Sequence, residues 1–362
     1  MINTLDIIEA QLRCNVLFSL INEYHDLRYF WMANKNLWEN KEKKKLCSIK
    51  LNCNMSTKYI DSIDFHNYIK SRVANPHKQI WLNFSKTSLQ SLVASEKLGV
   101  YSLNLSGCNN LSYIKNLRNV HTLNLSYCKK ISDVSALENV HTLYLFNCHG
   151  ITDVSALGNV HTLNLSYCRR ITDVTALGKV HTLNLSNCQG ITDVSALGNV
   201  HTLNLDNCLG VSDVSALRSN HSLVLSGCYD ITDVSALGRA CYLNLDNCRR
   251  ISDVSALGNV KSLSLAFCEL ITDVSALGNV HTLDLSYCRR ITDVSALGKV
   301  HTLSLSYCQG ITDVSALGNV HTLNLDNCNN ITDVSSLKGV NFLNLSYCSR
   351  VTGTIYLKNL NT

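Results

Sequence analysis

The chain has 362 residues, enough for two ordinary globular domains, and a formal net charge of +5 at pH 7. A charge this small gives no global basic field, so neither nucleic acid nor an anionic membrane is expected as the partner. No stretch approaches the roughly 18 uninterrupted apolar residues of a transmembrane helix. The first residues, with Asp6 and Glu9 among them, lack the pattern of a signal peptide, so no secretory leader is expected.

Residues 1–79 show helical patterning without repetition. Apolar side chains recur there at helical intervals, first at Leu5, Ile8, Leu12 and Val16 and then at Leu27, Phe30, Trp31 and Trp38. Residues 59–73 are expected to form one more helix before Pro76, the only proline of the chain. The spacing predicts a small helical segment over residues 1–79, separate from the part that follows at 80–362.

Residues 17–38 contain a set of short motifs in a fixed order. These are Leu17-Phe18-Ser19-Leu20, Asp26-Leu27, Asn34-Lys35 and Trp38. The set resembles an F-box, a small helical domain that docks onto the adaptor subunit of a cullin-type ubiquitin ligase, although the usual opening Leu-Pro is missing. The resemblance implies adaptor binding through Leu17, Leu20, Asp26, Leu27 and Trp38. The alternative is a helical cap whose apolar surface packs onto the first repeats.

A 20-residue unit recurs over most of the remaining chain, and one cysteine in each unit marks the register. The cysteine column runs from Cys108 to Cys348, which makes thirteen units and includes thirteen of the seventeen cysteines. A small disulfide-bonded protein does not space its cysteines this evenly. In a stacked coil, neighbouring thiols lie about 4.8 Å apart with parallel Cβ directions, which suits buried thiols better than disulfide bridges. We therefore expect reduced cysteines and a cytoplasmic location, or a nuclear one.

The unit at residues 160–179 illustrates the strand expected in each repeat. Leu163 and Leu165 alternate with polar residues, a period of two that predicts a short strand with its leucines inward. The positions predicted to face outward are Thr162, Asn164 and Ser166. Stacked copies predict a parallel sheet along one side of the coil.

The second half of the same unit has a different period. Ile171, Val174 and Leu177 follow one another at intervals of three, which predicts a 3₁₀ turn or a short α-helix. Asp173 stands just before this turn, where its carboxylate can accept hydrogen bonds from free backbone N–H groups. The unit therefore predicts an α/β solenoid, a coil with a parallel concave sheet and short helical turns on its convex side.

Two runs within the unit resemble known leucine-rich repeats. The Cys-x-x-Ile-Thr-Asp run at 168–173 is similar to the cysteine-containing class in substrate receptors of ubiquitin ligases. The recurring Asp-Val-Ser-Ala-Leu run resembles the Asp-Ile-x-Pro-Leu turn of bacterial internalin-like repeats. The resemblance covers residues 80–360 and implies a right-handed leucine-rich-repeat coil. The near-identical copies, rich in Asn, Lys and Ile, also resemble repeat proteins of large DNA viruses of amoebae, which would place the chain in a host cytoplasm.

Three periodic columns could carry chemistry. The histidines form ladders at 121–221 and 281–321, but ligands on one flat row converge poorly on an ion, so no metal or cofactor is expected. The aspartates from Asp133 to Asp333 are expected to cap the turns, because the Gly-rich calcium repeat is absent. Basic pairs after the strands either meet an acidic partner or form a solvated edge. These pairs are Lys129-Lys130, Arg169-Arg170, Arg249-Arg250 and Arg289-Arg290.

The outward positions of the predicted concave sheet are mostly Thr, Asn and Ser, so departures from them are candidate contacts with a partner. The departures are Tyr144, Phe146, Asp206, Tyr242, Asp246, Asp284 and Asp326, together with Val224. Exposed aromatic side chains on a binding face are typical hot spots, so Tyr144 and Phe146 lead this set. Drift among duplicated copies is the alternative interpretation.

No catalytic arrangement is recognisable in the sequence. It contains no Gly-rich phosphate loop, nucleophile elbow or zinc-protease motif, and its Cys and His residues co-occur because both are periodic. We therefore expect a monomeric, non-enzymatic scaffold whose concave face holds a protein target while the N-terminal segment holds the ligase adaptor. The alternative is a stand-alone leucine-rich-repeat binding protein with a helical cap and no ligase link.

Overall fold

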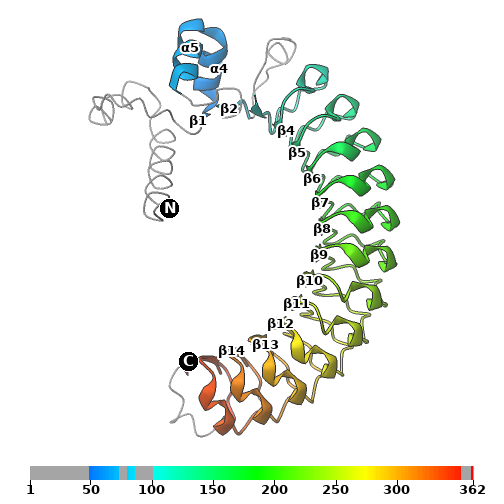
Figure 1. The fold of residues 1–362 in the computed structure, drawn as a ribbon, viewed down its shortest axis with the longest axis vertical. Helices are drawn as coiled ribbons and strands as arrows, with labels where there is room; N and C mark the ends of the chain where they lie inside the picture. Colours follow the sequence, from blue (N-terminus) through cyan, green and yellow to red (C-terminus); the bar gives the residue numbers. More distant parts are fainter. Residues whose placement is uncertain (1–48, 73–79, 86–100, 352–359, 362) are drawn as a thin grey trace, which may run out of the picture.

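The computed structural model describes residues 49–72, 80–85, 101–351 and 360–361. Within them the chain forms one sheet of sixteen parallel strands that follow one another in sequence order. Figure 1 shows these strands along the inner side of an arc and the helical turns along its outer side. The predicted fold class, a solenoid with a concave parallel sheet, is confirmed.

The strands are short because each repeat has room for only a few extended residues. They are β1 (Ile49–Leu51), β2 (Ile80–Asn83), β3 (Ser102–Asn104), β4 (Thr122–Asn124), β5 (Thr142–Tyr144), β6 (Thr162–Asn164), β7 (Thr182–Asn184), β8 (Thr202–Asn204), β9 (Ser222–Val224), β10 (Tyr242–Asn244), β11 (Ser262–Ser264), β12 (Thr282–Asp284), β13 (Thr302–Ser304), β14 (Thr322–Asn324), β15 (Phe342–Asn344) and β16 (Leu360–Asn361). Equivalent residues of successive repeats lie opposite each other, as Leu163 does to Leu183. The sequence period is therefore also the structural period.

The predicted turns are 3₁₀ helices on the convex side. They are η1 (Lys115–Leu117), η2 (Ser135–Leu137), η3 (Ser155–Asn159), η4 (Thr175–Lys179), η5 (Ser195–Asn199), η6 (Ser215–Ser219), η7 (Ser235–Leu237), η8 (Ser255–Leu257), η9 (Ser275–Asn279), η10 (Ser295–Lys299), η11 (Ser315–Asn319) and η12 (Ser335–Gly339). An apolar side chain at every third residue suits this helix, because its turn has three residues and keeps those side chains on one face.

The aspartate column caps these turns, as predicted. Asp173 Oδ1 accepts a hydrogen bond from the backbone N–H of Thr175 at 2.9 Å, and the equivalent bond recurs at all eleven aspartates from Asp133 to Asp333. The N–H and the hydroxyl of Thr175 both hold the pKa of the Asp173 carboxyl below its usual value, because they stabilise the ionised form. The column is thus part of the scaffold.

Seven side chains of each regular repeat form the core. In the repeat at 160–179 they are Val160, Leu163, Leu165, Cys168, Ile171, Val174 and Leu177, each no more than 2% exposed. Each repeat packs only on its two neighbours, so the core is one continuous stack along the arc and not a single globular centre. Such a stack leaves the concave and convex surfaces free to vary.

Twelve of the thirteen column cysteines are buried in this core and Cys348 is half-buried, and all thirteen thiols are hydrogen-bonded to the preceding repeat. Cys168 Sγ donates to the carbonyl oxygen of Leu145 at 3.2 Å, and the same bond joins the other twelve cysteines of the column to the repeat before them. Burial raises the pKa of Cys168 to about 11 and that of Cys148 to about 12, because a thiolate is poorly solvated there. These two thiols are therefore held in their neutral form.

The expectation that Ser166 faces outward is wrong. Ser166 is 2% exposed, whereas Thr162 and Asn164 are half-buried. Asn164 Oδ1 accepts hydrogen bonds from the Ser166 backbone N–H at 2.9 Å and from its hydroxyl at 2.6 Å. These bonds fold the serine back against the end of its strand, so the asparagine and the serine of the repeat belong to the scaffold as well as to the surface.

Two helices, α4 (Cys53–Asp61) and α5 (Ile63–Arg72), connect β1 to β2 on the outer side of the arc, where one helix was expected (Figure 1). Helix α4 lies against β1 and β2, and Tyr59 and Ile69 join the hydrophobic core. Strand β1 belongs to the segment expected to be separate, yet it pairs with β2 in register. The domain boundary between residues 79 and 80 stays a prediction.

A buried serine ties helix α4 to the first strands. Ser56 is completely buried, donates its hydroxyl to the carbonyl oxygen of Leu51 at 3.1 Å and accepts the backbone N–H of Asn83 at 2.9 Å. Asn52 starts the helix, because its Oδ1 accepts the backbone N–H of Met55 at 3.0 Å. The segment is therefore an atypical repeat, with α-helices in place of a 3₁₀ turn between β1 and β2.

Candidate functional site

Two columns of side chains border the concave surface. One consists of the residues just before the strands, which are mostly histidines. The other consists of the residues just before the column cysteines, here named the ridge positions, which recur every twenty residues from Gly107 to Tyr347. All thirteen ridge residues have a positive φ, for example 63° at Tyr167. The polar side chains of the strands lie between the two columns.

The ridge positions require a backbone conformation that favours glycine and asparagine. The chain indeed has Asn or Gly at seven of them, but it has Tyr or Phe at the other six. A large side chain in this conformation costs about 1–2 kcal/mol. Five of these six rings contact another aromatic ring, whereas Tyr347 is 78% exposed.

Four aromatic side chains gather on the concave surface around β5, and we name them the aromatic cluster: Tyr127, Tyr144, Phe146 and Tyr167. The ring of Phe146 lies 4.9 Å from that of Tyr127 and 5.1 Å from that of Tyr167, edge to face in both pairs. Tyr144 is 38% exposed and Tyr127 is 47% exposed. The structure thus places Phe146 between two ridge tyrosines that the sequence analysis missed, and Tyr144 lies at the end of β5 in the same repeat.

A second aromatic group occupies the ridge further along the chain. Tyr287 is stacked between Phe267, with ring centroids 4.1 Å apart, and Tyr307, at 4.3 Å, and the rings are nearly parallel. The sequence analysis missed this stack because it compared only the strand positions. The signal was an aromatic residue, repeated at twenty-residue intervals, where other repeats have Asn or Gly.

Two of the predicted acidic contacts are engaged within the scaffold. Asp246 accepts hydrogen bonds from Asn244 Nδ2 and from the backbone N–H of Ala266, both at 2.9 Å. Asp206 accepts one from Asn207 Nδ2, also at 2.9 Å. These carboxylates form hydrogen bonds to neighbouring residues and repeats, so part of their hydrogen-bonding capacity is already used within the scaffold.

The other predicted contacts on the C-terminal half differ in their surroundings. Asp284 accepts the backbone N–H of Ser286 at 2.8 Å, in the manner of the asparagine it replaces. Asp326 Oδ1 is buried and has no hydrogen-bond partner among the described residues. Tyr242 is 40% exposed on β10 and lies between Ser222 and Ser262 of the adjacent strands. These three residues do not form a cluster with Tyr144 and Phe146.

The histidines are stacked on one another along the concave border. Ring centroids of neighbours from His121 to His221 are 4.4–4.7 Å apart, and those from His281 to His321 are 4.6–4.7 Å apart. Burial, and then the neighbouring rings, lower the pKa of His161. Among the described residues no group of three His, Cys, Asp or Glu side chains is arranged to hold a metal ion.

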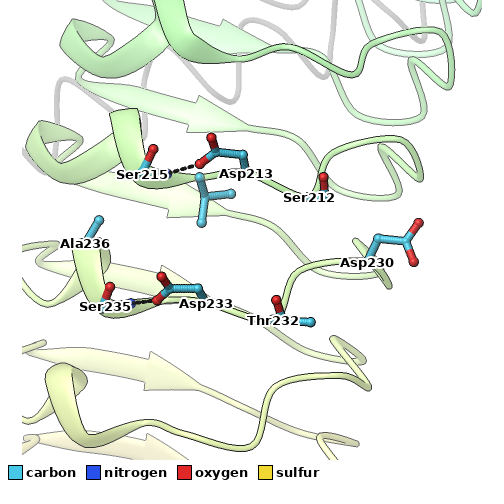
Figure 2. Close-up of a pocket in the computed structure, with 9 residues that line it drawn as sticks. Ser212, Asp213, Ser215, Asp230, Thr232, Asp233, Ser235 and Ala236 are labelled. Carbon is cyan, nitrogen blue, oxygen red and sulfur yellow. Dashed lines mark hydrogen bonds between the residues drawn. The ribbon is translucent and has the colours of Figure 1, made fainter.

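A pocket lies on the edge between η6 and η7, lined by Asp213, Asp230 and Asp233 among others. Figure 2 shows Asp213 and Asp233 turned toward the turns that they cap, with Asp230 set apart from both. Their Oδ1 atoms accept the backbone N–H groups of Ser215 at 2.9 Å and of Ser235 at 2.8 Å. The pocket is therefore a gap between two capped turns, and its carboxylates already have a structural role.

The predicted adaptor-binding residues Leu17, Leu20, Asp26, Leu27 and Trp38 lie outside the described residues. Within the described part of the chain, no helix is long and apolar enough to cross a membrane.

Charge divides the concave surface into two halves. Within residues 101–205 the outward positions of the concave sheet carry no Asp or Glu, because aspartates such as Asp133 and Asp173 lie at the convex turns, and the first acidic side chain on the concave sheet is Asp206. The basic pairs along the adjacent edge also differ between the halves. In the C-terminal half Arg250 pairs with Asp230 at 3.0 Å. In the N-terminal half, none of the described residues of the basic pairs forms an ion pair with a carboxylate.

A coil of short parallel strands and 3₁₀ turns, repeated every twenty residues around stacked leucines, is the architecture of leucine-rich repeats. A family model described as Leucine Rich repeat matches residues 116–138. The structure of an internalin, InlF, from Listeria monocytogenes is similar with 24% identity and a TM-score of 0.53, over 69% of this chain and 83% of that one. This likeness shows the fold.

Two other similar structures have lower TM-scores. The functional domain of InlJ from Listeria monocytogenes, which includes a cysteine ladder, has 20% identity and a TM-score of 0.46, over 73% of this chain and 66% of that one. The complex of Rad7 and Elc1 from yeast has 15% identity and a TM-score of 0.44, over 95% and 97%. No protein of curated function is detectably similar in sequence. Function must therefore be argued from the residues of this chain.

Proposed function

We propose that the chain is a protein-recognition scaffold that holds a protein target on its concave surface. The observation that carries the proposal is the aromatic cluster, a group of half-buried and exposed rings on a surface otherwise made of Thr, Asn and Ser. A leucine-rich-repeat coil presents a long concave sheet, which is a typical binding surface of solenoids. Tyr and other aromatic side chains supply most of the hot spots in protein interfaces.

Tyr144 gives the clearest reason to prefer binding over drift. The adjacent strands have asparagine at this position, and Asn124 Oδ1 accepts the backbone N–H of Ser126 at 3.0 Å. A tyrosine cannot make this bond, so the repeat has given up a scaffold contact for an exposed ring. The neighbouring position carries Phe146 in place of serine. Two coordinated departures in one repeat are what a contact site for a partner requires.

The repeats themselves supply a test variant that should fold. Tyr144→Asn with Phe146→Ser restores the residues of the flanking repeats, including the asparagine bond. A photoreactive phenylalanine placed at Asn184, on the concave side of β7, reports contact with a partner in an extract of the source cell. The same photoreactive group at Ser195, in the convex turn η5, is the matched negative control.

We expect protein adducts from the concave probe only, and unlabelled wild-type chain should compete for them. The restored variant should compete at least about tenfold less well, because losing a hot spot of about 2 kcal/mol weakens binding by more than a factor of ten. Tyr347→Asn, which removes an exposed ridge ring far from the cluster, should compete like wild type. Equal competition by the restored variant, or equal adducts from both probes, would remove the basis of the proposal.

The more specific function is substrate recruitment to a cullin-type ubiquitin ligase, and its support is the F-box-like motif order at residues 17–38. It is tested by pull-down of the purified adaptor subunit with the full chain, and with Leu27→Ala and Trp38→Ala as the matched variant. Binding that is lost in the variant supports a substrate receptor. No binding by the wild-type chain contradicts the ligase link and leaves a binding scaffold with a helical cap.

A further inference from the structure

We propose that the aromatic cluster and the basic edge beside it bind an acidic, extended segment of the target, in which Asp or Glu residues flank an apolar anchor. The basic edge consists of Lys129, Lys130, Arg169 and Arg170. The inference rests on the proposed recognition function and deepens it by assigning the chemistry of the partner to one half of the concave surface.

The basic edge is exposed and not neutralised by the scaffold. All four side chains are exposed, and none forms an ion pair with a carboxylate among the described residues. Lys130 Nζ lies 3.5 Å from Asn110 Oδ1, a neutral partner. Four cations along one border without a counter-charge favour an anionic ligand.

Carboxylates of the same repeats are engaged elsewhere. The column aspartates of these repeats, Asp133 and Asp173, cap convex turns by accepting N–H groups at 2.9 Å each, and Glu138 follows the convex turn η2. Edge residues between the basic pairs, His149 and Gly150, add no negative charge. An acidic ligand on this half would therefore meet positive side chains and neutral polar ones, with no fixed negative charge on the concave sheet.

The geometry brings an edge cation to the ridge. Arg249 shows this directly, because its Nε donates a hydrogen bond to Oδ1 of the ridge residue Asn247 at 2.8 Å. Arg169 stands in the same relation to the ridge residue Tyr167, two positions apart. A carboxylate lying over the ridge can thus reach a guanidinium while an apolar neighbour contacts Phe146 and the exposed side chain of Tyr144.

The second aromatic group provides an internal contrast. Arg289 and Arg290 occupy the same repeat positions as Arg169 and Arg170, six repeats further along. There, however, the rings of Phe267, Tyr287 and Tyr307 stack on each other, and Asp284 lies on the adjacent strand. A carboxylate ligand would be repelled by that aspartate, so the preference for acidic segments belongs to the N-terminal half alone.

A peptide fits these features better than a single-stranded nucleic acid. Nucleic acid requires cations that follow the phosphate backbone and open ring faces on which successive bases stack. Here the cations lie on one edge, and Phe146 is packed edge to face between Tyr127 and Tyr167, which leaves no row of parallel open faces.

The test uses the full chain and three fluorescein-labelled probes, measured by fluorescence anisotropy at low and physiological ionic strength. The probes are a Glu-rich peptide with a central Leu-Trp, the same peptide with Lys for every Glu, and an oligothymidylate of similar length. We expect the acidic peptide to bind at least about tenfold more tightly than either other probe. Its affinity should fall with added salt, since exposed charges are screened.

Charge reversal at the two arginine pairs locates the site. Arg169→Glu with Arg170→Glu should lower the affinity for the acidic peptide by about tenfold or more. The matched variant, Arg289→Glu with Arg290→Glu, should change that affinity less than about twofold. Arg169→Gln with Arg170→Gln, which removes charge without reversing it, should give a smaller loss. Melting curves followed by circular dichroism confirm that each variant is folded.

Equal loss from the two charge-reversed pairs would overturn the inference, as would equal binding of the lysine peptide or of the oligothymidylate. The proposed function has a separate readout in the photocrosslinking at Asn184. If the crosslink and its competition persist while the acidic peptide shows no preference, recognition stands and the assigned chemistry fails. If the crosslink also fails, the recognition function itself is wrong.

Discussion

At the scale of single residues, Asn220 is the most unfavourable side chain in the described core. Most other repeats have valine at this position, but here an amide is 1% exposed. Its Nδ2 donates to the carbonyl oxygen of Leu197 at 3.1 Å and to that of Val200, while its Oδ1 has no partner among the described residues. A buried polar atom without a hydrogen bond costs free energy that an apolar side chain of similar size would not.

Asn220→Val should therefore stabilise the chain by about 1–2 kcal/mol, because it restores the apolar side chain of the repeat and removes the unpaired oxygen. The free energy of unfolding in urea measures the effect. Val200→Asn, the reverse change one repeat earlier, should destabilise. A loss of stability in Asn220→Val would mean that the two bonds donated by Nδ2 outweigh the unpaired oxygen.

The cysteine column leads to a prediction of reactivity. Cys128 and Cys148 are fully buried, and burial raises the pKa of each thiol to about 12, so almost no thiolate is present at neutral pH. The thiolate is the nucleophile in alkylation. In the native chain these cysteines should resist iodoacetamide, whereas the half-buried Cys241 should react. Mass spectrometry of peptides after brief labelling, with urea-unfolded chain as the control, gives the measurement. Native labelling of Cys148 at the rate of Cys241 would contradict the buried column.

At the scale of elements, the stacked histidines make the concave border sensitive to acid. Protonated neighbours with ring centroids 4.6 Å apart, such as His141 and His161, would carry like charges in contact. Burial first, and then His141 and His181, hold the pKa of His161 below its ordinary value. Between that lowered value and the unfolded value near 6.5, the unfolded chain binds more protons than the folded one.

Stability should consequently be complete above about pH 6.5 and should fall as the pH decreases through and below that value. The turn aspartates do not contribute to this slope, because their pKa values are lowered from 3.8 and their carboxylates become protonated only in more acidic solution. The urea midpoint at several values from about pH 7.5 to 5 measures the slope. His161→Asn, which copies the residue at Asn341, should reduce it. Stability that increases on acidification through this window would contradict the prediction.

At the scale of the whole molecule, stability is a sum over repeats and their interfaces. Each strand pairs only with its two neighbours, and the contact pattern is nearly the same from one repeat to the next. No repeat is therefore indispensable to the fold in the way that a central core residue is indispensable to a globular domain. The N-terminal side is different, because there the α-helical residues Tyr59 and Ile69 belong to the core.

Deletion of one complete unit, residues 180–199, should leave a folded solenoid, because Lys179 then precedes Val200 as it preceded Val180. Far-ultraviolet circular dichroism should keep its shape, and the urea m-value should fall slightly with the surface that is lost. Deletion of residues 180–189 is the matched control, since half a unit joins a turn to another turn and breaks the register. Equal behaviour of the two deletions would show that the twenty-residue period is not the structural unit.

The aromatic cluster shows a limit of prediction from the sequence pattern, which does not reveal which residues of other repeats lie beside a given side chain. Tyr144 and Phe146 are visible as departures from a column, but the column alone does not show that ridge residues Tyr127 and Tyr167 flank them. The acidic departures illustrate the same limit, because Asp246 and Asp206 look like free contacts in the sequence and are partly engaged by neighbouring residues in the structure. Hydrogen bonds between repeats depend on the tertiary structure, and the repeat pattern of the sequence does not show them.

The twenty-residue period and its apolar spacing are enough to predict the repeat, its inward leucines, its capped turns and hence the class of fold, because such a unit buries its apolar side chains by stacking on its neighbours. Which polar side chains belong to the scaffold and which to the surface becomes visible in the folded coil alone. Alternation predicts that Ser166 faces outward, but the residue is buried, and its bonds to Asn164 hold it against the end of its strand. Periodicity records direction along one strand, whereas exposure depends on what the adjacent repeats place beside it.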